Sequence, residues 1–232
     1  MLDDKNYQTI QILSSGGCVR SLLSAKLKRL AEARSTVMKF RRICVFCGSN
    51  LGNRGEYRAA AEQLASVLVQ GGIELIYGGG NIGLMGVLAD TVLAAGGKVI
   101  GVIPESLMAR EVGHLGLTEL RIVGSMHERK ALMSDLSDAF LALPGGFGTL
   151  EEFCEVVTWS QLGIQEKPCG LLNVAGYYDP LLRLFDLAVS EGFLHPDNRQ
   201  LVLDDPNPHC LLQKMAEFQP TRRAKWIGRE ER

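Results

Sequence analysis

Three glycine-rich turns, each directly after a short apolar run, constrain the fold of this chain more than any other feature. The runs 43–46, 73–77 and 139–143 are followed by the turns CGSN (47–50), GGGNIGLMG (78–86) and PGGFGT (144–149). Glycine lets a backbone approach a ligand closely, and free N–H groups at helix starts bind anions. Because the carboxyl ends of parallel strands meet at one edge of a sheet, we expect the turns to converge there on a phosphorylated ligand.

Apolar runs alternate with helix-period segments from residue 41 onward. Strands are expected at 43–46, 73–77, 99–103, 120–123, 139–143 and 169–173. Helices are expected at 56–70, 83–95, 126–136, 149–162 and 178–191, and glycine pairs at 71–72 and 96–97 end two of them. This alternation predicts an α/β fold with a doubly wound parallel sheet flanked by helices, in a single domain.

The two ends of the chain differ from its middle. Residues 1–38 are interpreted as an N-terminal extension, and disorder and a misassigned start site both stay open as explanations. Within it, 19–34 has the pattern of a basic amphipathic helix, for which a membrane or partner arm is the alternative interpretation. Residues 39–218 form the predicted nucleotide-binding domain, and 219–232 form a polar C-terminal tail.

Composition excludes several classes of function. The net charge is -1 and the body of the chain carries no basic stripe, which argues against polymeric nucleic acid as a partner. No apolar run is long enough to cross a membrane and no secretory segment is present, so we expect a cytoplasmic protein without a membrane partner. Cys44 and Cys47 form one isolated C-x-x-C, interpreted as buried thiols rather than a redox or zinc site. The four histidines lack ligand spacing, so no metal site is expected.

The second glycine turn also fits a dinucleotide-binding fingerprint. Gly78, Gly80 and Gly83 satisfy G-x-G-x-x-G. The pattern follows the second predicted strand instead of the first, and the acidic residue at a suitable distance, Glu105, lies behind a proline in a loop. A nicotinamide enzyme is therefore disfavoured.

The segment SMHERK (125–130) predicts a helix start beside an anion. Ser125 and Glu128 have the spacing of a capping box, which gives Glu128 a structural role. Arg129 and Lys130 then lie in the first turns of the helix, where positive charge opposes the helix dipole. A nearby anion explains this unfavourable placement, and a solvated basic patch is the alternative.

Three carboxylates follow the third glycine turn. Glu151, Glu152 and Glu155 fall within five residues, more than helix capping requires. Glu151, Glu155 and Thr158 share one helical face, while Glu152 points elsewhere. A carboxylate beside a bound ribose could stabilise the positive charge that develops at C1′ during glycoside cleavage.

Residues 43–198 resemble the LONELY GUY family of cytokinin riboside 5′-monophosphate phosphoribohydrolases, often mislabelled as lysine decarboxylases. The resemblance rests on VFCGS (45–49), YGGG (77–80), GLMG (83–86), VIGVIP (99–104), MHERK (126–130), PGGFGTLEE (144–152), TWSQLG (158–163) and GYY (176–178). It implies a Rossmann-like sheet, no cofactor, a homodimer or higher oligomer, and a purine nucleoside 5′-monophosphate as partner.

The resemblance also assigns roles to residues. Arg129 and Glu152 correspond to the catalytic pair of the family. The substrate-binding residues that it implies are Gly48, Ser49, Gly79, Gly80, Glu111, Lys130, Gly145, Gly146, Phe147, Gly148, Thr149, Leu150, Glu151 and Thr158. The expected reaction is hydrolysis of the N-glycosidic bond to free base and ribose 5-phosphate. In it Lys130 helps to hold the phosphate, Glu152 faces the ribose, and Arg129 holds the phosphoribosyl unit or assists departure of the base.

The main alternative is a non-catalytic carrier of a nucleotide or of molybdenum cofactor that uses the same phosphate cradle. Such a carrier needs the glycine turns but not Arg129 and Glu152 together, so the pair favours an enzyme. A lysine decarboxylase is rejected because neither Lys98 nor Lys167 has the context of a Schiff-base lysine. The base pocket is expected to involve the loop 105–119 and the methionines Met85, Met126 and Met133, and adenine and N6-substituted adenine both stay open as the base.

Overall fold

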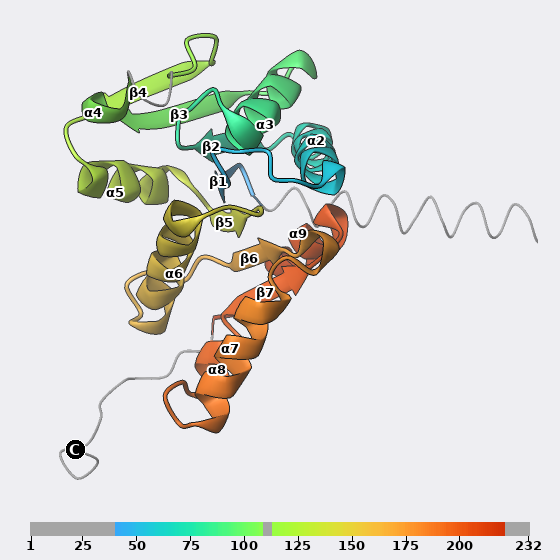
Figure 1. Cartoon of the computed structure of the whole chain (residues 1–232). Helices are drawn as coiled ribbons and strands as arrows, with labels where there is room; N and C mark the ends of the chain where they lie inside the picture. The colour runs from blue at the N-terminus through green and yellow to red at the C-terminus, as the bar shows by residue number, and fades with distance from the viewer. Residues whose placement is uncertain (1–39, 109–112, 221–232) are drawn as a thin grey trace, which may run out of the picture. The chain divides into compact units, whose positions relative to one another are not determined.

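The computed structural model describes residues 40–108 and 113–220 (Figure 1). The predicted extension 1–38, with its candidate helix at 19–34, lies outside the described residues. So do most of the predicted C-terminal tail and Glu111, one of the predicted substrate contacts. None of the described helices is long and apolar enough to cross a membrane.

The described residues form one parallel sheet of seven strands in the order β4-β3-β2-β1-β5-β6-β7. The strands are β1 (Arg42–Phe46), β2 (Glu74–Tyr77), β3 (Val99–Pro104), β4 (Glu119–Val123), β5 (Ala139–Ala142), β6 (Cys169–Leu172) and β7 (Val202–Asp205). The first strand lies in the middle, and the chain builds the sheet outward from it, first to one side and then to the other. The order therefore reverses between β1 and β5, which is where ligands bind in sheets of this kind.

Helices cover both faces of the sheet. They are α2 (Gly55–Gln70), α3 (Gly83–Ala94), α4 (Glu105–Met108), α5 (Met126–Leu136), α6 (Phe147–Gln161), α7 (Asp179–Ser190), α8 (Pro196–Arg199) and α9 (Pro208–Glu217), with a 3-10 turn, η1 (Val174–Gly176). Figure 1 shows α2, α3 and α9 on one side of the sheet and α5 and α6 on the other. The doubly wound α/β fold predicted from the sequence is confirmed.

Two apolar cores, one on each face, follow from the alternation of side chains along the strands. In β1, Ile43 and Val45 pack with α2, α3 and α9, whereas Cys44 and Phe46 pack with α5 and α6. Each of the four is at most 5% exposed. A strand buried on both faces has no polar side, which is why the runs in the sequence are continuously apolar.

The predicted strands and the five predicted helices occur within two residues of their expected ends. Strand β7 and helix α9 were not predicted from the sequence. Strand β7 lies at the edge of the sheet and three of its four residues are only half-buried, so its apolar signal is weak. The start of helix α9 does carry sequence signals of a helix N-terminus. Asn207 caps the N–H groups of His209 and Cys210, and Pro208 follows at the first helical position.

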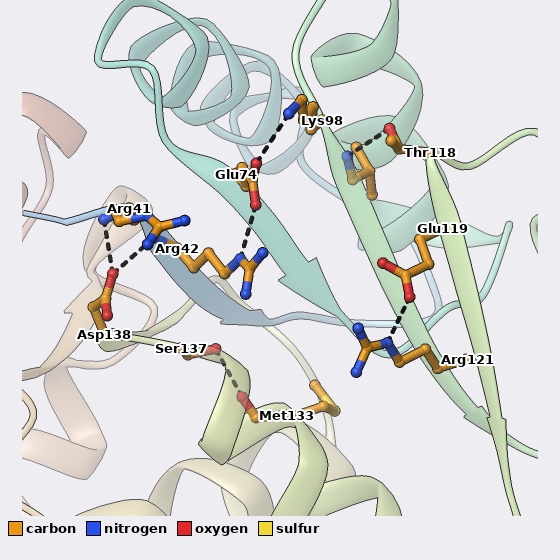
Figure 2. A network of polar contacts seen from close by, with 11 residues as sticks. Arg41, Arg42, Glu74, Lys98, Thr118, Glu119, Arg121, Met133, Ser137 and Asp138 are labelled. Carbon is orange, nitrogen blue, oxygen red and sulfur yellow. Dashed lines mark hydrogen bonds and ion pairs between the residues drawn. The ribbon is translucent and has the colours of Figure 1, made fainter.

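Ion pairs fix the amino ends of the central strands, at the edge opposite the glycine turns (Figure 2). The Glu74 carboxylate lies between Arg42, with Nε at 2.8 Å, and Lys98, with Nζ at 3.4 Å. The Asp138 carboxylate accepts the backbone N–H groups of Arg41 and Arg42 at 2.7 and 2.9 Å. These contacts tie β1 to β2, β3 and the start of β5, and so help to hold the register of the strands that lead into the turns.

Candidate active site

A cavity of about 270 Å³ lies at the carboxyl ends of β1 and β5, where the strand order reverses. Its walls come from the turns after β1, β2 and β5, the starts of α5 and α6, and single residues of α3 and α4. The lining residues are Val45, Phe46, Cys47, Gly48, Ser49, Gly78, Met85, Leu107, Met126, Arg129, Gly146, Phe147, Gly148, Thr149, Glu151 and Glu152. The predicted convergence of the three glycine turns is therefore confirmed.

The turns contact one another through their backbones. The N–H of Gly48 donates to the carbonyl of Pro144 at 3.1 Å, and the N–H of Leu84 donates to the carbonyl of Gly48 at 3.0 Å. Gly83 has φ +60°, and a Cβ there would lie 2.2 Å from the carbonyl carbon of Ser49. Only glycine allows so close a backbone contact, so this residue joins the first and second turns.

Arg129 and Glu152 face each other across the cavity from α5 and α6. Their side chains are 7% and 11% exposed, and Nη2 of Arg129 lies 3.8 Å from Oε1 of Glu152. The guanidinium also lies against Gly78, where a Cβ would approach Nη2 to 2.1 Å. The structure thus brings the two predicted catalytic residues together, and the second turn needs a glycine at 78 to make room for the guanidinium.

The guanidinium of Arg129 retains unused hydrogen-bonding capacity. Nη1 donates to the thioether sulfur of Met126 at 3.7 Å, which is a weak acceptor. Nε is buried and has no hydrogen-bond partner among the described residues. A buried guanidinium with weak partners is costly to the fold, because charged groups lose hydration on burial. Its donors are suited to an anion that enters the cavity.

The start of α6 contributes free backbone N–H groups to the cavity wall. Gly146 is the N-cap residue and provides no capping side chain, so the first turn of the helix keeps its N–H groups available. A Cβ at Gly146 or Gly148 would meet nothing within 4 Å, so the approach to this turn is open. The Phe147 side chain is 94% exposed at the mouth of the cavity. Helix dipole and free N–H groups together make this turn chemically suited to an anion.

Lys130 pairs with two carboxylates of α6. Its ammonium lies 2.6 Å from Oε1 of Glu151 and 3.0 Å from Oε1 of Glu155, and the lysine does not line the cavity. Burial lowers the pKa of Lys130, but the hydrogen bonds to the two carboxylates outweigh that effect and raise its pKa above the usual value. The predicted contact of Lys130 with the nucleotide stays a prediction.

Several other predicted substrate contacts lie outside the cavity walls, namely Gly79, Gly80, Gly145, Leu150 and Thr158. The carbonyl of Gly79 accepts the N–H of His114 at 3.0 Å, and Gly80 pairs with Gly113. These two glycines therefore bind the loop after α4, and Gly78 is the one that reaches the cavity. The Thr158 hydroxyl donates to the carbonyl of Cys154 within α6.

Several residues that line the cavity were not predicted to contact substrate. Cys47 is such a case, because it was interpreted only as a buried thiol. Burial and the nearby Glu152 raise the pKa of the Cys47 thiol, so it is a neutral part of the wall. Leu107, Met85 and Met126 do line the cavity, as expected for a base pocket, whereas Met133 is 1% exposed in the core.

The helix start at 125–130 has the predicted capping interactions. Oγ of Ser125 accepts the N–H of Glu128 at 3.1 Å. The Glu128 carboxylate accepts the N–H of Gly124 at 2.7 Å, one residue before the position that a standard capping box uses. The structural role predicted for Glu128 is confirmed. Among the described residues, no group of three or more His, Cys, Asp or Glu side chains could hold a metal ion.

Comparison with known proteins gives concordant matches. The model of a family described as possible lysine decarboxylase matches residues 85–215. The cytokinin riboside 5′-monophosphate phosphoribohydrolase LOG of Oryza sativa subsp. japonica is 54% identical over 182 residues, which cover 78% of this chain and 75% of the relative. LOG1 of Arabidopsis thaliana, which has the same activity name, is 52% identical over 182 residues, 78% of this chain and 85% of the relative.

Solved structures share the fold at low sequence identity. A molybdenum cofactor binding protein from Rippkaea orientalis has a TM-score of 0.55 and 22% identity, covering 75% of this chain and 94% of that one. The molybdenum cofactor carrier protein of Chlamydomonas reinhardtii has a TM-score of 0.56 and 18% identity, covering 76% and 98%. At this identity the likeness concerns the fold alone.

Proposed function

This chain belongs to the family of cytokinin riboside 5′-monophosphate phosphoribohydrolases, and on that premise we propose that it hydrolyses the N-glycosidic bond of a purine nucleoside 5′-monophosphate. The products are the free base and ribose 5-phosphate. The observation that carries the proposal is the buried pair of Arg129 and Glu152 beside the open start of α6. A phosphate site next to a buried carboxylate is what cleavage at C1′ of a nucleotide requires.

The 5′-phosphate binds at the start of α6 in this proposal. The N–H groups of Phe147, Gly148 and Thr149 provide the donors, and the helix dipole favours the negative charge. Nη2 of Arg129, which lies beside Glu152, can donate to the phosphoribosyl unit. Binding of the phosphate then holds C1′ next to Glu152, and this positioning lowers the activation free energy of hydrolysis.

Glu152 acts on the reacting sugar. As the base leaves, positive charge develops on C1′ and the ring oxygen, and a nearby carboxylate stabilises that charge most in the transition state. The same carboxylate can orient the water that attacks C1′. The cavity excludes most solvent around this group, since the side chain of Glu152 is only 11% exposed, and low solvation strengthens the interaction.

The purine lies toward the apolar wall of the cavity. Met85, Leu107 and Met126 come from three different helices and supply a thioether and aliphatic surface. Such side chains adapt to flat aromatic ligands of slightly different shape. Adenine and N6-substituted adenine are both compatible with this wall, so AMP and a cytokinin nucleotide are the two substrates to compare.

The decarboxylase description that the family model carries is not supported by the cavity. A pyridoxal phosphate enzyme forms a Schiff base with a lysine, and no lysine is among the described residues that line the cavity. Lys98 lies on Glu74 at the opposite edge of the sheet, and Lys167 donates to the carbonyl of Ser134 at 2.7 Å.

We further propose that the enzyme is a homodimer. Helix α7 has no buried residue, although its sequence is strongly amphipathic. Leu184 and Leu187 lie three residues apart on one side of the helix and are 57% and 53% exposed, and Phe193 just beyond the helix is 90% exposed. An exposed apolar stripe of this kind is typical of an interface with a second copy. The expected cytoplasmic location stays a prediction.

The test is release of free base from AMP and from N6-isopentenyl-AMP, followed by chromatography. We expect the wild type to release base and Glu152→Gln to lower kcat by at least about a hundredfold, since the charge that stabilises the transition state is lost. Glu62→Gln is the matched control, because this carboxylate pairs with Arg58 on the surface of α2. Tight nucleotide binding without any release would leave the carrier as the function.

A further inference from the structure

The glycine turn before α6 can bind an anion only if its peptide groups direct their N–H groups toward the cavity. Gly146 lines the cavity, and the peptide group between Gly145 and Gly146 supplies its N–H. A flip of this peptide group rotates the backbone only within two glycines, which tolerate most conformations. The flipped peptide would present a carbonyl oxygen in place of an N–H, and a carbonyl oxygen repels a phosphate. The site therefore needs a contact that fixes this peptide group.

Three consecutive carbonyl groups, those of residues 143–145, accept hydrogen bonds from other parts of the chain. The donors are the Tyr178 hydroxyl, 2.6 Å from the carbonyl oxygen of Leu143, the N–H of Gly48, 3.1 Å from that of Pro144, and the Tyr177 hydroxyl, 2.5 Å from that of Gly145. All three distances are those of ordinary hydrogen bonds. The orientation of each carbonyl group in this stretch is therefore fixed by a donor outside it.

The two tyrosine hydroxyls have different consequences for the turn. In a trans peptide the N–H points opposite to the carbonyl, and the described residues contain no cis peptide bond. Because the Gly145 oxygen faces Tyr177, which does not line the cavity, the N–H of Gly146 is directed away from that tyrosine. The carbonyl that Tyr178 holds is followed by Pro144, which has no N–H. Of the two tyrosines, only Tyr177 orients a hydrogen-bond donor.

The ring of Tyr177 is held in place by its surroundings. It meets the rings of Tyr57 and Tyr178 edge-on, with centroids 5.8 and 5.0 Å away, an arrangement that aromatic pairs favour. The backbone turns sharply just before it, with φ +72° at Gly176. The residue is 38% exposed, yet these contacts direct its hydroxyl to the Gly145 carbonyl. A donor that is ordered before the ligand arrives reduces the entropy cost of binding.

We propose that Tyr177 is a positioning residue whose hydroxyl holds the Gly145 carbonyl away from the cavity, so that the N–H of Gly146 joins the donors at the start of α6 that bind the phosphate of the substrate. Tyr177 itself touches no atom of the substrate. The proposal rests on the function proposed above, because it assumes a phosphorylated ligand at this turn. It gives the two tyrosines of the segment 176–178 separate roles, since Tyr178 supports the fold.

Two variants, Tyr177→Phe and Tyr178→Phe, test the proposal, because each keeps the ring and removes one hydroxyl. Calorimetry measures the dissociation constants of ribose 5-phosphate, which carries the phosphate, and of adenosine, which lacks it. We expect Tyr177→Phe to weaken binding of ribose 5-phosphate about tenfold, and to leave adenosine binding within about twofold and the urea midpoint of unfolding nearly unchanged. Tyr178 is 1% exposed, so Tyr178→Phe should lower the urea midpoint and leave ribose 5-phosphate binding within about twofold.

The amide proton of Gly146 gives a direct readout of the same contact. In the wild type we expect its NMR signal to move downfield when ribose 5-phosphate binds, because the N–H then donates to a charged oxygen. In Tyr177→Phe saturated with the same ligand, the change should be clearly smaller. The measurement on the wild type keeps the proposal testable even if a variant folds poorly, since a Gly146 signal that ribose 5-phosphate does not move would overturn it.

Equal weakening of ribose 5-phosphate binding in both variants would also overturn the proposal, because the turn would then depend on general stability and not on one peptide group. So would equal weakening of ribose 5-phosphate and adenosine in Tyr177→Phe, or no weakening of either. Base release by the wild type is measured independently of these constants. Release combined with unchanged binding in Tyr177→Phe would remove the role of Tyr177 and keep the enzyme. Phosphate-selective weakening without release would keep that role and remove the hydrolase.

Discussion

Arg129 shows at the scale of one residue how a function can be recognised from an unfavourable placement. A positive charge in the first turns of α5 opposes the helix dipole, and a guanidinium that is only 7% exposed loses most of its hydration. Its contacts with the Met126 thioether and with Glu152 at 3.8 Å compensate poorly. The fold keeps a residue that weakens it, which is typical of positions that act on a ligand.

Gly78→Ala should show whether activity depends on the position of the Arg129 guanidinium, because the substitution displaces that group without removing it. The new Cβ would lie 2.1 Å from Nη2, and the guanidinium can move aside because it ends a flexible side chain. We expect kcat for base release to fall about ten- to a hundredfold, while the free energy of unfolding changes by less than about 1 kcal/mol. Gly55→Ala is the control, since a Cβ there meets nothing within 4 Å. Equal activity of the two variants would contradict this role of Gly78.

At the scale of elements, the amino ends and the carboxyl ends of the strands have different roles. The amino ends of β1, β2 and β3 are tied by ion pairs, whereas the carboxyl ends of β1, β2 and β5 lead into the glycine turns that line the cavity. The glycine turns were visible in the sequence because they follow strand ends. Their mutual contacts were not, because hydrogen bonds such as Gly48 to Pro144 join residues almost a hundred positions apart.

The pH dependence of the free energy of unfolding in Glu74→Gln should show how much the ion pairs at the amino ends of the strands stabilise the protein. The hydrogen bond from Arg42 is the main cause that lowers the pKa of Glu74 from 4.5, Lys98 adds to it, and burial opposes it. A lowered pKa in the folded state stabilises the protein above the unfolded pKa, and that stabilisation is lost as pH falls through the folded value. We expect the variant to lose about 0.5–1 kcal/mol at pH 7 in urea denaturation, and the difference to vanish near about pH 2. A constant difference at both pH values would exclude this linkage.

Gly83→Ala should show how strongly the first two turns depend on their contact. Gly83 and Gly96 both have positive φ, at +60° and +78°, but only at Gly83 would a Cβ meet another backbone. Gly96→Ala is expected to cost about 1–2 kcal/mol from the backbone conformation alone. Gly83→Ala should cost at least about 2 kcal/mol more, measured by urea denaturation, and should weaken AMP binding. Similar losses in the two variants would mean that the turns are not held by this contact.

At the scale of the whole molecule, strand order decides where the chemistry takes place. β1 and β5 are neighbours although almost a hundred residues separate them, and the reversal of order between them leaves a cavity at their carboxyl ends. This arrangement brings α5 and α6 together over one face of the sheet. On the same side, α7 packs Leu181, Leu182 and Phe185 against the core and leaves the opposite stripe uncovered.

Leu184→Asp should convert the proposed homodimer into a monomer. The substitution places a charge within the exposed stripe of α7, where an interface would have to bury it. Light scattering after size-exclusion chromatography measures the mass, and 25.3 kDa is expected for the variant against twice that for the wild type. Leu115→Asp, at a leucine that is 85% exposed in a different loop, should leave the dimer intact. A wild type that elutes as a monomer would rule out the interface.

The sequence by itself determined the kinds of element, their order and the glycine turns between them, because hydrophobic period, helix caps and glycine punctuation are local properties. It also pointed to Arg129 and Glu152. Only the tertiary structure decided that Arg129 meets Glu152 while its neighbour Lys130 meets Glu151 and Glu155. Adjacent helical residues point about 100° apart, so the rotation of α5 against the sheet decides which of them reaches the cavity. That rotation is set by the packing of buried residues such as Met133 against strands distant in the chain.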